Sequence, residues 1–104
     1  MARAPDLGRL EEAVSRVGKS VRGVIDAGQS KQAALGEVFR LNNEIGRMAR
    51  EHPWLAPALK EMQLEVNLLT IQLKRDQPDA ASLGVERMAA ALGGVRSAIV
   101  ASGD

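Results

Sequence analysis

Residues 18 to 20 read Gly-Lys-Ser, which is how a phosphate-binding loop of nucleotide-binding proteins ends. In such a loop, backbone N–H groups hold the phosphates and the lysine side chain reaches them. The first glycine of the motif would stand at position 13, where this chain has Ala13, and a strand would have to precede the loop. The stretch instead lies within apolar residues at helical spacing. We therefore interpret Lys19 as a residue on a helix.

Carboxylate pairs and a histidine are the other groups that could do acid–base or metal chemistry. Glu61 and Glu65 stand four residues apart, and Glu11 and Glu12 are adjacent. Helical di-metal sites use Glu-x-x-His spacing, but the residue three positions before the single histidine, His52, is an alanine. We interpret the glutamates as solvated helix charges and His52 as a partly exposed turn residue. The prediction is no catalytic residue, no cofactor and no metal site.

Composition excludes further classes of chemistry. The chain has no cysteine, which excludes disulfides, thiolate zinc sites, iron–sulfur clusters and a cysteine nucleophile. Its 14 basic and 13 acidic residues leave a net charge of +1, which argues against broad nucleic-acid binding. A length of 104 residues fits one domain, residues 1–104, with a modest core.

Four segments carry apolar residues at three- and four-residue spacing and predict helices near residues 5–26, 30–51, 54–75 and 80–101. Gly28 and Ser30 favour a break between the first two, with one continuous helix as the alternative. Pro53 stops the second helix, and no segment alternates like a strand. We predict an all-α fold: a three- or four-helix antiparallel bundle with the third helix at its centre, whose core self-association could complete.

The segment 54–75 carries more apolar residues than one neighbouring helix can cover. One stripe runs from Leu55 to Leu73, and Leu64, Leu68 and Ile71 form a second stripe beside it. We predict that this second stripe contacts a partner.

Two aromatic residues and an asparagine have an ambiguous position. Trp54, in the central turn, and Phe39 either pack on their own chain or join a partner interface. Asn42 stands at a core position of the segment 30–51, where a buried asparagine needs a hydrogen-bond partner. A rotated helix would bury Leu41 instead and turn Asn42 and Asn43 to water.

These features favour a non-enzymatic protein–protein interaction module, such as an adaptor, a small chaperone or a subunit of a larger assembly. It would form a homo-oligomer or bind a helical protein partner. The alternative is a small dimeric DNA-binding or transcription-associated regulator that uses Arg40, Arg47 and Arg50.

No stretch is long and apolar enough to span a membrane, and charges at Asp6 and Arg9 interrupt any signal-peptide core. We therefore expect a cytoplasmic protein. Secretion of a folded helical pair would need no such signal and stays an alternative.

Overall fold

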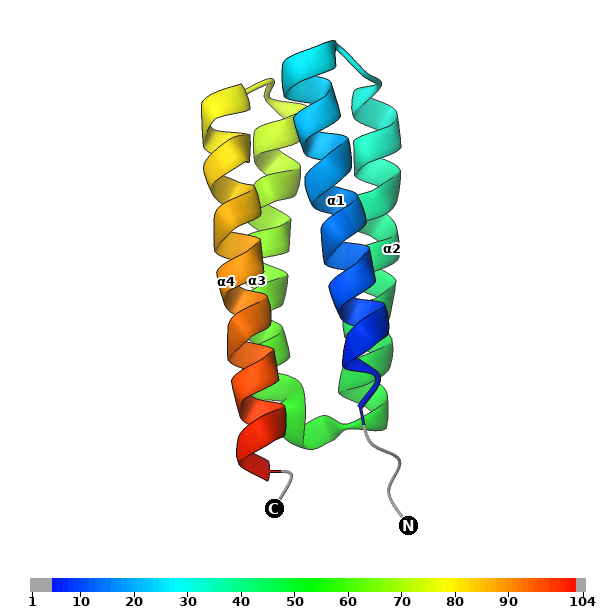
Figure 1. Ribbon diagram of the computed structural model, residues 1–104, viewed down its shortest axis with the longest axis vertical. Helices are drawn as coiled ribbons and strands as arrows, with labels where there is room; N and C mark the ends of the chain where they lie inside the picture. Colours follow the sequence, from blue (N-terminus) through cyan, green and yellow to red (C-terminus); the bar gives the residue numbers. More distant parts are fainter. Residues whose placement is uncertain (1–4, 103–104) are drawn as a thin grey trace.

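The computed structural model describes residues 5–102, and within them four α-helices run antiparallel, one after another (Figure 1). The helices are α1 (Leu7–Ala27), α2 (Lys31–Glu51), α3 (Ala56–Lys74) and α4 (Pro78–Ser102), and one short 3₁₀ turn, η1 (Pro53–Leu55), precedes α3. The predicted all-α antiparallel bundle is confirmed, with four helices whose bounds lie within two residues of the predicted ones.

Each helix packs against two neighbours. α2 lies between α1 and α3, and α4 lies between α3 and α1, so that the four helices stand at the corners of a rod 47 Å long and 18 by 17 Å across. The prediction of a central third helix is therefore wrong. Four amphipathic helices of similar length bury one stripe each by facing a common axis, and none of them needs to be surrounded. Every helix, α3 included, keeps an outer face.

The turn between α1 and α2 is built by Gly28 and Ser30. Gly28 has φ 62°, the left-handed conformation that glycine adopts without penalty, and the N–H of Gln29 donates to the carbonyl of Gly23 at 3.0 Å. Ser30 then caps α2, because its Oγ accepts from the N–H of Ala33 at 3.3 Å. The alternative of one continuous helix through Gly28 is excluded.

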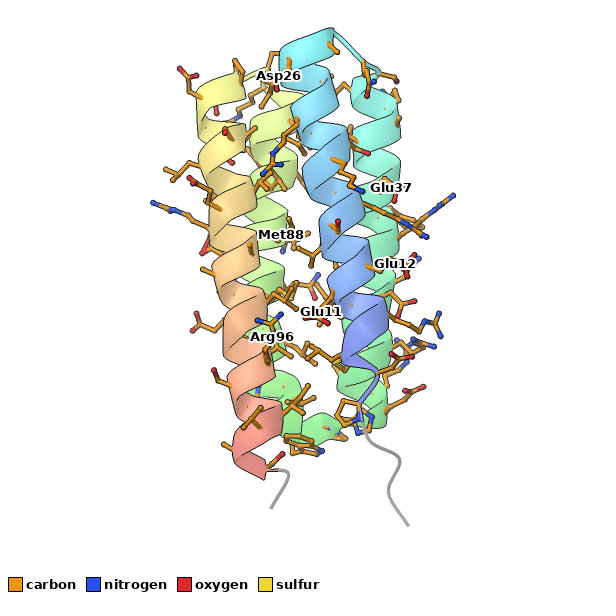
Figure 2. All side chains as sticks on the ribbon, in the orientation of Figure 1. Glu11, Glu12, Asp26, Glu37, Met88 and Arg96 are labelled. Carbon is orange, nitrogen blue, oxygen red and sulfur yellow. The ribbon has the colours of Figure 1, made fainter. Side chains whose placement is uncertain are left out.

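Buried apolar side chains from all four helices and η1 form one core (Figure 2). They are Leu10, Val14, Val17 and Val21 of α1; Ala34, Val38, Leu41, Ile45 and Met48 of α2; Leu55 of η1; Leu59, Met62, Val66, Leu69 and Leu73 of α3; and Ala81, Met88, Leu92 and Val95 of α4. Burying a large apolar side chain contributes roughly 1.5–3 kcal/mol, so the core residues hold the bundle together.

Close approach of α4 to α3 depends on Gly84. A Cβ atom at this position would lie 3.2 Å from Cδ1 of Leu69 and 2.5 Å from Oε1 of Gln72. Gly94 lies on a different face of α4 and is exposed, and a Cβ atom added there would meet nothing within 4 Å. The two glycines of one helix therefore differ: Gly84 makes room for α3, whereas Gly94 only lowers the helical propensity of α4.

Gly94→Ala should raise the free energy of unfolding by about 1 kcal/mol, because alanine restricts the unfolded chain and meets no obstacle in the helix. Gly84→Ala should gain less or lose stability, since Leu69 and Gln72 must move. Urea denaturation followed by circular dichroism at one protein concentration measures both. Equal gains at the two positions would contradict the close packing of α4 on α3.

Candidate functional site

Three large apolar side chains on α3 point away from the core. Leu64 is 59% exposed, Leu68 36% and Ile71 44%. We call these three residues the α3 outer stripe. Their spacing of four and three residues puts them on successive turns of one helical face, nearly opposite the buried Leu59, Val66 and Leu73. The prediction that Leu64, Leu68 and Ile71 form a second stripe is confirmed, and its contact with a partner stays a prediction.

The neighbouring helices cover only the flanks of α3. On one flank, Gln63 reaches Asn42 of α2. On the other flank, Glu61 and Glu65 line a shallow groove with Arg87 of α4. Since α2 and α4 occupy these two sides, nothing of the described chain lies over the outer face between them.

Charged side chains stand at both ends of the α3 outer stripe. Lys60 and Glu61 precede it, and Lys74 and Arg75 follow it, and all four are exposed. None of them takes part in the ion pairs found among residues 5–102. The stripe is therefore an apolar surface with one basic and one acidic residue before it and two basic residues after it. All four charged side chains lie outside the ion pairs of the described chain.

Phe39 and Leu83 extend this apolar surface onto the neighbouring helices. Phe39 of α2 is 66% exposed, and Leu83 of α4 is 48% exposed. The hydrogen bond between Asn42 and Gln63 sets Phe39 level with Val66 on the antiparallel α3. Gly84 beside Leu69 sets Leu83 level with Thr70, about one helical turn further along α3. Sequence reasoning missed Leu83, because apolar spacing does not separate the inner and outer faces of an alanine-rich helix.

Trp54 lies on η1, at the end of the bundle. Its ring meets His52 edge to face, with centroids 6.3 Å apart, and the residue is still half-exposed. Ten residues separate it from Leu64, about 15 Å along the helix axis. Trp54 is thus packed in part on its own chain and stands apart from the α3 outer stripe, so that a partner contact there would be a separate one.

His52 is buried, with 6% of its surface exposed, so the interpretation as a partly exposed turn residue is wrong. Its backbone ends α2, because its N–H donates to Met48 at 2.8 Å, and its carbonyl accepts from Leu55 at 2.9 Å. Pro53 turns the chain back at this point, which places Trp54 against the imidazole. The role of His52 seen here is to join α2 to η1.

Asn42 follows neither predicted alternative fully. Leu41 is buried and Asn43 is exposed, as in the rotated helix, but Asn42 is half-buried and accepts a hydrogen bond from Nε2 of Gln63 at 2.9 Å. The partner comes from α3 of the same chain. This bond satisfies two polar groups at the α2–α3 contact and fixes how the two helices align.

The Gly-Lys-Ser stretch lies inside α1, as predicted, with Gly18 buried and Lys19 exposed. Two of the singled-out glutamates form ion pairs: Glu11 binds Arg96 of α4, and the two lie on the facing sides of their helices (Figure 2). Glu12 binds Arg16. In the part of the chain that the structure describes, no three His, Asp or Glu side chains gather closely enough to hold a metal ion.

The arginines of α2 lie beside glutamates. Arg47 binds Glu44 at 2.6 Å, Glu44 also accepts from Arg9 of α1 at 3.0 Å, and Arg40 lies 3.6 Å from Glu37. These pairs neutralise much of the basic ridge that a DNA-binding surface would need. Across residues 5–102, no helix has the length and apolar character to cross a membrane.

Comparisons with protein-family models, with curated proteins and with solved structures find no match to this chain. Its function therefore has to be argued from its surface. On that surface the α3 outer stripe stands out, because it places three large apolar side chains on consecutive turns and the described chain leaves them 36% to 59% exposed.

Leu64→Ala and Leu69→Ala should separate the outer stripe from the core. Leu69 is buried, so Leu69→Ala should lower the free energy of unfolding by roughly 2–5 kcal/mol, because apolar burial is lost and a cavity forms. The exposed Leu64 should cost about 0.5 kcal/mol or less. Urea denaturation followed by circular dichroism at one low protein concentration measures both. A loss at Leu64 as large as that at Leu69 would show that Leu64 belongs to the core.

Proposed function

We propose that this protein is a non-enzymatic helical interaction module that binds protein through the α3 outer stripe. The observation that carries the proposal is the exposure of Leu64, Leu68 and Ile71 on consecutive turns of one helix. Large apolar side chains that are grouped in this way mark interaction surfaces more often than scattered ones do. A helical face of this kind suits a partner that offers a helix or a groove.

The free energy available at the stripe supports this proposal. Burying the exposed parts of its three side chains would contribute about 1 kcal/mol each, at roughly 25 cal/mol per Å² of apolar surface. Phe39 and Leu83 flank the stripe and add further apolar area. Association also costs translational and rotational freedom, so several such side chains must be buried together for a complex to form. The stripe provides them on one rigid element.

The charged side chains of the bundle support an architectural role. Arg9 with Glu44 connects α1 to α2, Glu11 with Arg96 connects α1 to α4, and Lys31 with Asp76 connects the turns at one end. These groups are engaged in tying helices together. An adaptor or an assembly subunit needs such a rigid scaffold, because a preformed surface loses less conformational freedom on binding.

Site-specific photo-crosslinking in the cells that make the protein tests this proposal. A photoreactive residue in place of Leu64 should give a discrete protein adduct, and Leu68→Glu in the same chain should abolish it, because a buried charge would oppose the apolar contact. The matched control carries the photoreactive residue in place of Val100, which is exposed on α4 and lies outside the stripe.

Adducts at position 64 that equal those at position 100 in pattern and yield, or that persist with Leu68→Glu, would contradict the proposal. Circular dichroism of the Leu68→Glu variant should show unchanged helicity, since Leu68 is not part of the core. This control separates loss of binding from loss of folding.

A further inference from the structure

We propose that the α3 outer stripe is covered by a second copy of this chain, whose α3 lies antiparallel to the first across a two-fold axis at Leu68. The inference rests on the proposed function, because it names the partner of the same surface. The inference follows from the order of residues along the outer face of α3. When a second α3 lies antiparallel on this face, apolar residues meet apolar residues and acidic residues meet basic ones.

The apolar residues of the stripe match one another in this arrangement. A two-fold axis perpendicular to α3 pairs positions that lie equally far before and after the axis. Leu64 precedes Leu68 by four residues and Ile71 follows it by three. Ile71 of one copy therefore lies within one residue, about 1.5 Å along the helix axis, of the level of Leu64 of the other copy, and the two Leu68 side chains meet at the centre. All three exposed side chains are covered at once.

The charged residues at the ends of the stripe agree with the same axis. Glu61 stands seven residues before Leu68, and Arg75 stands seven residues after it. Seven residues make about two helical turns, so these three residues lie along one line of the helix. In the antiparallel pair, Glu61 of each copy comes opposite Arg75 of the other, which gives two opposite-charge contacts. Both residues are exposed and outside the ion pairs of the described chain.

A parallel pair of α3 helices lacks this complementarity. It would bring Glu61 opposite Glu61 and Arg75 opposite Arg75, so that both contacts would be repulsive. Lys60 stands eight residues before the axis and Asp76 eight residues after it, but Asp76 follows the end of α3 and binds Lys31 of its own chain. The charge pattern therefore favours the antiparallel arrangement through Glu61 and Arg75.

Cysteine crosslinking tests the arrangement directly. Because the chain contains no cysteine, each variant carries a single reactive thiol at the chosen position. Single-cysteine variants treated with a short bis-thiol crosslinker report which positions of two copies meet. Leu68→Cys, at the axis, should crosslink to itself about tenfold more than Ser97→Cys, an exposed position on α4. Leu64→Cys and Ile71→Cys should each crosslink weakly alone and strongly when the two variants are mixed.

Charge reversal tests the register independently. Glu61→Arg and Arg75→Glu should each weaken dimerisation on the order of tenfold, because each creates two like-charge contacts. An equimolar mixture of the two variants should regain the wild-type dissociation constant, since every contact in the mixed dimer again joins opposite charges. The measurement is sedimentation equilibrium at low salt, where exposed charges are least screened.

Several outcomes would overturn the inference. If the Leu64→Cys variant crosslinks strongly to itself when the Ile71→Cys variant is absent from the sample, the two α3 helices are parallel. Equal crosslinking at positions 68 and 97, or no weakening by charge reversal, would show that α3 does not pair with itself. If the photo-adduct at position 64 then contains a different protein, the interaction module stands and the homodimer falls. If position 64 gives no specific adduct either, both proposals fall together.

Discussion

A helix in a four-helix bundle has two neighbours, so its own chain can cover only part of its circumference, and the surface of this protein depends on that constraint. In α1 the large side chains lie on or beside one stripe, which the arrangement buries or half-buries. α3 is different, because it carries five buried apolar residues and three exposed ones on the opposite side. Adding apolar residues to a helix whose inner face is already packed cannot enlarge the core. It can only make an apolar outer surface.

Much of this architecture could be predicted from sequence, because the signals are local. Apolar spacing gave the four helices, and Gly28, Ser30 and Pro53 marked their ends through backbone conformation and capping. The positions of Asn42 and His52 could not be predicted, since one depends on Gln63 of another helix and the other on how Trp54 packs beyond a turn. The second stripe of α3 could be predicted from its spacing. The exposure of Leu83 could not, because Leu83 lies among small residues whose pattern does not distinguish the inner face of the helix from the outer one.

The charged residues fall into two groups, as the apolar residues do: some contact neighbouring helices of the same chain and others do not. Ion pairs such as Arg9 with Glu44 and Glu11 with Arg96 connect neighbouring helices, whereas Glu61 and Arg75 remain outside the pairs of the described chain. Exposed ion pairs add little stability, so their value lies in orientation and specificity. In the proposed homodimer, the apolar stripe of α3 would provide the free energy of association, and the two end charges would determine the direction of the second helix. The proposed homodimer would therefore use both kinds of exposed residue.

The most direct test of this account is the solution mass of the wild-type protein, measured by sedimentation velocity over a wide range of concentrations. The account predicts a mass that rises with concentration from 11.1 kDa to twice that value and no further, because a two-fold contact through one face closes on itself. A mass of 11.1 kDa at every concentration, or growth beyond a dimer, would contradict it.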